Sequence, residues 1–315
     1  MGSETETAPS ISVIDFSTNL VPGTPSWDLV KSQVLKAAEE CGCFMADFKG
    51  IPREVQETMD DALEELYGLP LETKLRNVSE KPYHGYIGQS PLLPLFEGMG
   101  FDHPQLYDNV DEFTRLMWPQ GYPNFSKTIH QFSKPLAELD QTIRRMIVES
   151  LGVEHYVDEF LNSAYYVIRV AKYEAPGTTE KKWGLKTHKD QNVMSILSQN
   201  QINGLELQTK DGEWIEVKFS PDHYLVIFGE AFNAWTNGRL YCPYHRVMMS
   251  GNKNRYSAGV FSLPNEGYVI KAPKELVDEE HPEAFKPYEF IDYLKQRTKE
   301  TGKTVEDPLK AYYGV

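Results

Sequence analysis

The sequence predicts a mixed α/β protein with a mainly β core, a double-stranded β-helix (jelly roll) with a helix-rich N-terminal region and flanking helices. Three observations predict it. Apolar residues in the first third recur at helical spacing. From about residue 163 onward, short strand candidates alternate with turn signals such as Asn203-Gly204 and Asp211-Gly212. A His-x-Asp pair and a distant histidine must come from different strands, and a double-stranded β-helix, with its two sheets face to face, can bring them together.

Residues 1–10 are acidic and polar, and we expect them to form a disordered tail. Residues 11–120 are expected to form a mixed, helix-rich region. Its expected elements are a strand over 11–16, a helix that Ser26 caps and Gly42 ends, a strand over 43–48, and a helix that Pro52 opens. Glycine, proline and aromatic residues dominate residues 80–124, which we expect to form long loops around a cavity.

Residues 121–315 are expected to hold a long helix, the β core and a C-terminal helix. The long helix covers about 125–146, where apolar residues recur at four-three spacing and Pro135 introduces a kink. The final helix covers about 285–299 and packs outside the core. The expected strands are 164–174, 192–198, 204–209, 213–218, 223–229, 244–249 and 255–262.

The composition limits the classes of partner. The formal charge is −14, from 46 acidic and 32 basic residues, which disfavours nucleic acids and anionic membranes because both bind basic surfaces. The three cysteines imply no disulfide framework, and no apolar stretch is long enough to span a membrane. We therefore expect a monomer in the cytoplasm that acts on a small molecule.

His188, Asp190 and His245 are the candidate metal ligands and catalytic residues. Fifty-four residues separate Asp190 from His245. Two imidazoles and one carboxylate on one face of a metal form the facial triad of non-heme Fe(II) oxygenases, which leaves positions open for a bidentate co-substrate and O₂. The alternative is that these are solvated polar residues. The remaining histidines, His84 among them, are expected at the surface.

A carboxylate-binding pattern follows the second histidine. Arg255-Tyr256-Ser257 lies ten residues beyond His245. A guanidinium pairs with a carboxylate as a fork, and a hydroxyl adds one donor. The alternative is an ordinary strand arginine and serine.

The surrounding motifs resemble those of the plant 2-oxoglutarate and Fe(II)-dependent dioxygenases. The resemblance covers about residues 11–300 and is carried by Ile14-Asp15-Phe16, Gly42-Cys43-Phe44, Thr236-Asn237-Gly238 before His245-Arg246-Val247, and Arg255-x-Ser257. Within the family the chain is most similar to the glucosinolate side-chain dioxygenases that make alkenyl and hydroxyalkyl products. Leu116–Gly121, Ala137–Thr142 and Asn203–Glu206 carry that closer likeness.

The resemblance implies that His188, Asp190 and His245 bind Fe(II), and that Arg255 and Ser257 hold 2-oxoglutarate. Tyr173 matches the co-substrate tyrosine of an N-x-Y motif, although it could be a plain core tyrosine. The expected reaction consumes O₂ and 2-oxoglutarate, releases succinate and CO₂, and oxidises a small molecule, with ascorbate as a supporting reductant.

The chain departs from the family's pattern at two positions. Ala171 replaces the asparagine of N-x-Y, which puts one polar contact near the metal in doubt, and Glu230 follows Gly229 where Gly-Asp is usual.

Two other functions stay open at this point. One is an Fe(II) oxidase of the same fold that does not use 2-oxoglutarate, and the other is a non-catalytic jelly-roll binding protein. The aromatic residues Tyr83, Tyr86, Phe96 and Trp118 are candidates for the substrate lining, with core packing as the alternative. The triad does not choose between hydroxylation, desaturation and demethylation.

Overall fold

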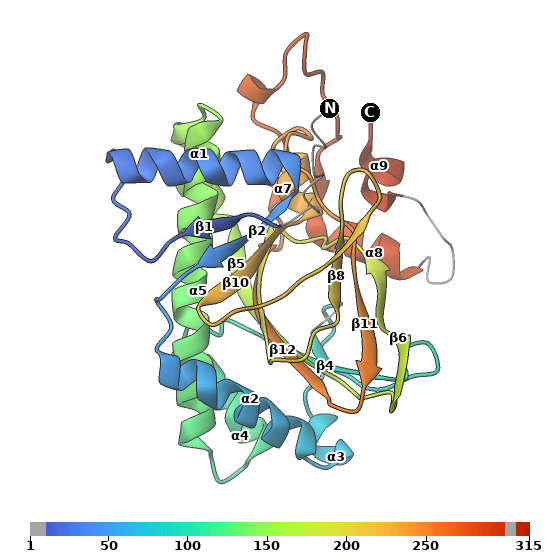
Figure 1. Ribbon diagram of the computed structural model, residues 1–315. Coiled ribbons are helices and arrows are strands. Elements are labelled where there is room, and N and C mark those ends of the chain that lie inside the picture. The colour runs from blue at the N-terminus through green and yellow to red at the C-terminus, as the bar shows by residue number, and fades with distance from the viewer. Residues whose placement is uncertain (1–10, 83, 300–306) are drawn as a thin grey trace, which may run out of the picture.

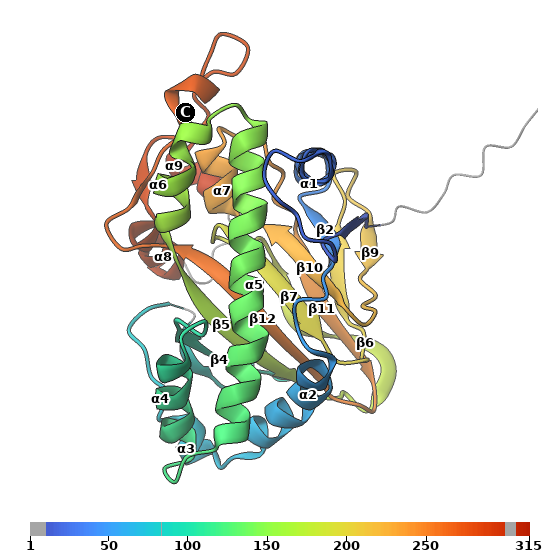
Figure 2. The same ribbon diagram turned by 90° about the vertical axis from the view of Figure 1, so that its left-hand side faces the viewer.

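The computed structural model describes residues 11–82, 84–299 and 307–315. Two β-sheets lie face to face, and helices cover the outer face of the larger sheet, as Figure 1 and Figure 2 show. The predicted jelly roll with flanking helices is therefore confirmed. The expected tail at residues 1–10 lies outside the described residues.

The larger sheet has eight strands, and all neighbours are antiparallel except the first pair. In sheet order they are β1 (Val13–Asp15), β2 (Cys43–Asp47), β10 (His223–Phe228), β7 (Met194–Gln199), β12 (Arg255–Pro264), β5 (Ala164–Tyr173), β4 (Phe96–Asp102) and β3 (Gly85–Ile87). Segments before and after residue 120 thus share one sheet.

The smaller sheet has four strands, in the order β6 (Thr178–His188), β11 (His245–Gly251), β8 (Leu205–Gln208) and β9 (Trp214–Glu216). A two-stranded ribbon joins β13 (Val269–Ile270) to β14 (Tyr288–Glu289). Figure 1 shows the smaller sheet on the side of the molecule away from the long helix α5.

The described helices are α1 (Pro25–Glu40), α2 (Arg53–Gly68), α3 (Leu71–Lys74), α4 (Tyr107–Met117), α5 (Pro123–Ser150), α6 (Val157–Asn162), α7 (Glu230–Trp235), α8 (Phe290–Lys299) and α9 (Pro308–Tyr313), with short 3₁₀ turns at Glu154–Tyr156 and Lys274–Leu276. In Figure 2 α5 runs across the outer face of the larger sheet. Among the described helices, none is long and apolar enough to cross a membrane.

Side-chain alternation along each strand divides the apolar residues between two cores. On β5, Tyr166, Ile168 and Val170 pack between the larger sheet and the helices. Ala171 and Tyr173 face the other way and pack between the two sheets. The second core is the interior of the jelly roll, and it holds the candidate site.

Two boundaries of α1 follow from local chemistry. The Thr24 hydroxyl accepts the backbone N–H of Trp27, so Thr24 and not Ser26 is the N-cap. Pro25 occupies the first turn, where its missing N–H costs nothing. The predicted end is confirmed, because Gly42 has a φ of 68°, a left-handed conformation that favours glycine.

The expectation of long loops over 80–124 is wrong, because this segment contains β3, β4 and α4. Strand β4 was missed since it reads Phe96-Glu-Gly-Met-Gly, and glycines weaken a strand signal. Strand β6 was missed because its side chains are mostly polar and exposed. Helix α5 runs continuously through Pro135. The helix predicted over 285–299 is α8, which begins at Phe290, five residues after the predicted start, and a further helix, α9, follows it.

Candidate metal and co-substrate site

Two neighbouring strands of the smaller sheet bring the candidate metal ligands together. His188 ends β6, His245 begins β11, and the two residues are direct partners in the antiparallel register. Asp190 follows two residues after His188, where the chain leaves the sheet. Hydrogen-bonded strand pairing therefore explains how residues far apart in the sequence meet.

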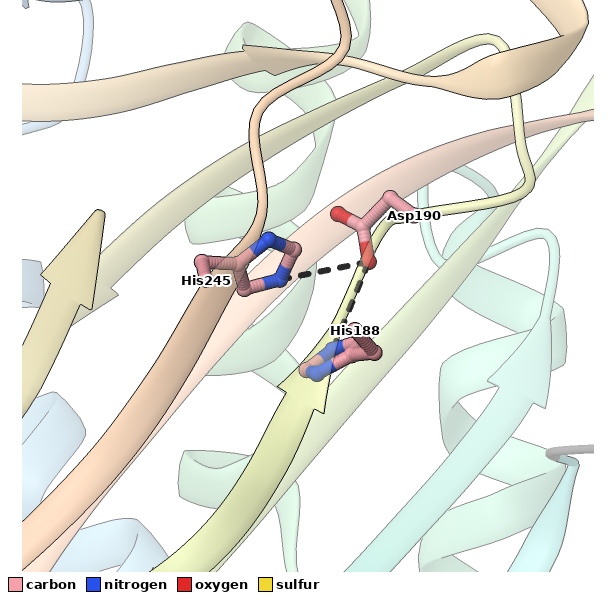
Figure 3. Close-up of side chains that lie close together, drawn as sticks. All are labelled: His188, Asp190 and His245. Atoms are coloured by element: carbon pink, nitrogen blue, oxygen red, sulfur yellow. Dashed lines mark ion pairs between the residues drawn. The ribbon is translucent and has the colours of Figure 1, made fainter. Parts of the chain in front are cut away.

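The three side chains converge on one point, as Figure 3 shows. Asp190 Oδ1 lies 3.8 Å from His188 Nε2 and 3.5 Å from His245 Nε2. The candidate ligand atoms all lie within 4.8 Å of one another. This spacing suits three ligands of one ion, each about 2.0 to 2.2 Å from it.

The imidazoles are oriented by their other nitrogens. His188 Nδ1 lies 2.8 Å from the Lys186 carbonyl oxygen, and His245 Nδ1 lies 3.4 Å from that of Pro243. A carbonyl oxygen only accepts, so each Nδ1 carries the proton. Each Nε2 then presents a lone pair to the space beside Asp190, which is the tautomer that a metal requires.

Asp190 is held by a buried polar network. The Ser195 hydroxyl donates to Asp190 Oδ2 at 2.6 Å, and the Asn192 side-chain amide donates to Ser195 Oγ at 3.1 Å. The backbone N–H of Glu230 donates to the Asp190 carbonyl at 2.8 Å. These bonds leave Oδ1 directed at the two imidazoles.

The electrostatics favour the ligand forms of Asp190 and His188. For His245, burial lowers the pKa, but the Asp190 carboxylate outweighs burial and raises it. Burial alone would raise the pKa of Asp190, but His245, His188 and the Ser195 hydroxyl hold that pKa well below its usual range. Burial lowers the pKa of His188 to about 4, and His245 acts in the same direction. At neutral pH Asp190 is therefore ionised and His188 is neutral, which are the forms that bind a metal.

Arg255 and Tyr173 are direct partners across β12 and β5, and Ser257 is the partner of Ala171. The Arg255 guanidinium is buried, 4.9 Å from the centre of the Tyr173 ring. Its Nε donates to Gln199 Oε1 at 2.9 Å. Its Nη1 is buried and has no hydrogen-bond partner among the described residues.

These residues fit the groups that the sequence implies. A buried guanidinium nitrogen without a partner is costly, and a ligand carboxylate would satisfy it. Two imidazole nitrogens and one carboxylate oxygen form a donor set that suits Fe(II). The donor set and the Arg255 group share one cavity, so a co-substrate can contact both.

That cavity, which we call the triad cavity, has a volume of about 80 Å³. All six candidate residues of the metal and co-substrate sites line this cavity. Its other lining residues include Arg169, Ala171, Phe96, Leu185, Leu197, Leu205, Val247 and Phe261. Its wall is mostly apolar, which excludes water from around the polar groups. A larger hollow of about 240 Å³ beside α2 shares Ser257 and Ala258 with it but touches no candidate metal ligand.

The four candidate substrate residues are scattered. Phe96 lines the triad cavity, with its ring 5.4 Å from that of Tyr173. Tyr86 donates to Glu97 at 3.2 Å and does not line the cavity. Trp118 packs in the helical layer, 4.9 Å from the Phe125 ring. Tyr83 lies outside the described residues.

Two features of the site, and the place of one histidine outside it, were missed from the sequence. Ser195 and Gln199 on β7 support Asp190 and Arg255, and only the strand register reveals this. Arg169 lines the triad cavity, and its period-two spacing from Tyr173 was the signal that could have found it. His84 is not at the surface as expected but buried, with Nε2 3.0 Å from Asp102 Oδ1, because that carboxylate satisfies the ring.

Comparisons with known proteins agree with this geometry. Residues 161–264 match the 2OG-Fe(II) oxygenase superfamily, and residues 11–99 match the N-terminal region described as that of a non-haem dioxygenase in morphine synthesis. The Arabidopsis thaliana protein named "Probable 2-oxoglutarate-dependent dioxygenase AOP1.2" is 47% identical, covering 96% of this chain and 97% of its own. The chain belongs to the 2OG-Fe(II) oxygenase superfamily.

Two further relatives support this assignment. The Arabidopsis thaliana 2-oxoglutarate-dependent dioxygenase AOP3 is 33% identical, covering 100% of this chain and 99% of its own. The solved 2-oxoglutarate complex of dioxygenase for auxin oxidation 1 from the same plant has a TM-score of 0.79 and 25% identity, covering 87% of this chain and 100% of that one. The predicted family, and the group expected within it, are confirmed. This oxygenase is an oxidoreductase that uses 2-oxoglutarate and Fe(II).

Proposed function

We propose that His188, Asp190 and His245 hold the Fe(II) of this oxygenase, and that each supplies one ligand atom. The observation that carries the proposal is the convergence of the three ligand atoms within 4.8 Å, with both Nδ1 atoms turned to backbone carbonyls. Three protein ligands leave open positions for a bidentate co-substrate and O₂.

Arg255, Ser257 and Tyr173 bind the distal carboxylate of 2-oxoglutarate in this proposal. The unpartnered Arg255 Nη1 supplies a charged donor, and Gln199 holds the other side of the guanidinium in place. Burial raises the pKa of the Tyr173 hydroxyl, although Arg255 opposes this rise, so the hydroxyl keeps its proton and can donate.

When bound, Fe(II) would couple the oxidation of an unactivated C–H bond to the reduction of O₂ and the decarboxylation of 2-oxoglutarate. That decarboxylation releases succinate and CO₂. The residues of this chain bind the metal and the co-substrate, orient them, and exclude water. Ser195 fixes the Asp190 carboxylate, Arg255 sets the direction of the co-substrate, and the apolar lining keeps water from the reacting groups.

The primary substrate is a small specialised metabolite, as for the auxin-oxidising structural relative. The proposed outcome is hydroxylation, with desaturation and demethylation as alternatives that share the same C–H step. We further propose that the protein works as a cytoplasmic monomer and that ascorbate keeps its iron reduced. The −14 charge supports a small-molecule partner and not a polyanion.

The direct test of the iron site is the variant Asp190→Ala. Wild-type protein incubated anaerobically with Fe(II) and 2-oxoglutarate is expected to bind both, and to form succinate when O₂ and ascorbate are added. Asp190→Ala is expected to abolish metal binding and succinate formation, because it removes the anionic ligand. The matched control is Asp211→Ala, an exposed carboxylate in the turn before β9. Unchanged succinate formation by Asp190→Ala would overturn the iron assignment.

The variant Arg255→Gln tests the co-substrate site. Loss of the charged fork is expected to weaken 2-oxoglutarate binding about 10- to 100-fold while metal binding persists. Titration of 2-oxoglutarate into the anaerobic Fe(II) protein measures both. If Arg255→Gln binds 2-oxoglutarate as the wild type does, the carboxylate site lies elsewhere.

A further inference from the structure

Met249 is a buried side chain just beyond the wall of the triad cavity. On the inner face of β11, His245, Val247 and Met249 follow one another at every second position. His245 and Val247 line the cavity, whereas Met249 is not among the described lining residues. Met249 is fully buried in the core between the two sheets. The strand thus leads from a proposed iron ligand, along the cavity wall, to a methionine beyond it.

Two buried glycines bring Met249 against the proposed co-substrate residues. A Cβ atom placed on Gly184 would lie 3.0 Å from Met249 Cγ and 2.9 Å from Tyr173 Cδ1. A Cβ atom placed on Gly204 would lie 3.3 Å from Met249 Sδ and 3.4 Å from Arg255 Cδ. Carbon atoms in contact are about 3.5 to 4.0 Å apart, so neither position has room for a side chain. Met249, Tyr173 and Arg255 are therefore packed together at one end of the cavity.

A β-bulge places Gly184 beside Tyr173. Two consecutive residues of β11 pair with Leu185 and Trp183 of β6, so Gly184 between them has no partner in this register. The main chain of β6 approaches the Tyr173 ring there, and only a glycine leaves space for it. The centre of the Phe96 ring lies 5.4 Å from that of the Tyr173 ring. The tyrosine is thus confined, and it cannot move without displacing a buried neighbour.

Arg255 is confined as well. Its Nε donates to Gln199 Oε1 at 2.9 Å, and its Cδ and the Met249 sulfur meet at the Gly204 position. Its buried Nη1 has no hydrogen-bond partner among the described residues and is the donor proposed for the distal carboxylate. A ligand carboxylate must therefore reach this nitrogen where it lies, because the arginine has little room to withdraw.

We propose that Met249 sets the length of the dicarboxylate that the co-substrate site accepts, and so selects a five-carbon 2-oxo diacid over a six-carbon one. The inference rests on the proposed function and deepens it, since the metal would hold the 2-oxo acid end and Arg255 the distal carboxylate. A diacid with one more methylene needs more distance between these two ends. Arg255 and Tyr173 would have to move into the space that Met249 fills, and a packed interior resists such a shift.

The test compares 2-oxoglutarate with 2-oxoadipate, which is longer by one methylene. Binding is measured by calorimetry on the anaerobic Fe(II) protein, so the readout does not depend on turnover. Wild-type protein is expected to bind 2-oxoglutarate about 10- to 200-fold more tightly, the usual range for one surplus methylene in a closed pocket. Met249→Ala is expected to lose most of that preference, chiefly by binding 2-oxoadipate more tightly, because the vacated space lets Arg255 and Tyr173 withdraw.

The matched control is Met248→Ala. It makes the same change one residue earlier, on the opposite face of β11, and is expected to keep the preference. Met249→Leu nearly conserves the side-chain volume and is also expected to keep it. Thermal unfolding checks that each variant is folded, and Met249→Val, which also shortens the side chain, carries the same prediction if Met249→Ala is not. If the wild type binds both acids equally, or if the folded shortened variant keeps the wild-type preference, the proposal is wrong.

The same titrations separate this proposal from the proposed function. If the wild type binds no 2-oxoglutarate, or if Arg255→Gln binds both acids as the wild type does, the proposed residue roles fail. If those roles hold but neither Met249→Ala nor Met249→Val gains affinity for 2-oxoadipate, only the role of Met249 fails.

Discussion

At the scale of single residues, the orientation of Asp190 depends on Ser195. The serine is fully buried, and its hydroxyl donates to Oδ2 at 2.6 Å, which leaves Oδ1 for the metal. Groups that orient a metal ligand in this way contribute to metal affinity without touching the metal. The serine is thus a positioning residue for the proposed iron site.

We expect Ser195→Ala to weaken Fe(II) binding about 10- to 100-fold, because the carboxylate loses the donor that orients it. Anaerobic calorimetry measures the affinity. Ser198→Ala, on the opposite face of the same strand, is the control and should bind Fe(II) normally. Equal affinities for Ser195→Ala and wild type would mean that Asn192 or the backbone alone positions Asp190.

The metal-ligand candidates could be predicted from the sequence, whereas their supporting residues could not. His188, Asp190 and His245 belong to a pattern whose chemistry is specific to their residue types. Ser195 and Gln199 are common residue types that gain a role only because β7 lies beside β12 and close to Asp190. Their role depends on strand register, which no local pattern encodes.

At the scale of elements, strand prediction from the sequence failed where a strand lacks the usual alternation of apolar and polar residues. Gly98 and Gly100 made β4 look like a loop, yet these glycines pair with Ala171 and Arg169 of β5, and the Phe96 ring covers Gly98 where a side chain would lie. Strand β6 carries His188 but has a polar, exposed surface, so no apolar alternation marked it. Strands with ordinary alternation, such as β5 and β12, were predicted within about two residues.

Helix α8 packs against a buried carboxyl group. Tyr293 donates to Glu230 Oε2 at 2.6 Å, and burial raises the pKa of Glu230 from its ordinary value of 4.5 to about 7. Between these two values the folded protein holds a proton that the unfolded chain has released. Stability from this group is therefore present at acidic pH and is lost as the pH rises through about 7.

Glu230→Gln should remove this pH dependence, because glutamine does not titrate and still offers a carbonyl to Tyr293. Relative to the wild type, the variant is expected to gain stability between about pH 5 and about pH 7, and the difference is expected to level off at higher pH. Thermal unfolding of metal-free protein across that range measures the difference. The exposed Glu283→Gln is the control. Parallel curves for Glu230→Gln and wild type would show that Glu230 is ionised throughout.

A buried ion pair joins helix α3 to β4. Lys74 Nζ lies 2.6 Å from Glu97 Oε2, and both side chains are largely buried. Lys74→Met should destabilise the fold by about 3 to 5 kcal/mol, because it leaves Glu97 as an uncompensated buried charge. Urea unfolding measures the loss, and the double variant Lys74→Met, Glu97→Leu should recover much of it. Lys182→Met, which removes an exposed pair with Glu180, should cost about 1 kcal/mol or less.

At the scale of the whole molecule, the larger apolar core and the proposed iron site occupy different parts of the fold. The core between the larger sheet and the helices contains most of the buried apolar side chains and none of the proposed iron ligands. The core between the sheets is smaller and contains Tyr173 and Phe96 at the triad cavity. The proposed iron site thus lies in the interior with less apolar packing of its own, so bound groups should add measurably to the stability of the molecule.

We therefore expect Fe(II) and 2-oxoglutarate together to stabilise the protein against unfolding. A ligand that binds only the folded state adds about 2.7 kcal/mol at a concentration one hundred times its Kd. Anaerobic thermal unfolding with Fe(II) alone, with 2-oxoglutarate alone and with both should show the largest shift for the pair, because under the proposed function 2-oxoglutarate would contact both the metal and Arg255. Asp190→Ala should lose the shift from Fe(II), and Arg255→Gln should lose only the additional shift from 2-oxoglutarate. If 2-oxoglutarate shifts Asp190→Ala as much as it shifts the wild-type protein, it binds without the metal, and the bridging arrangement is wrong.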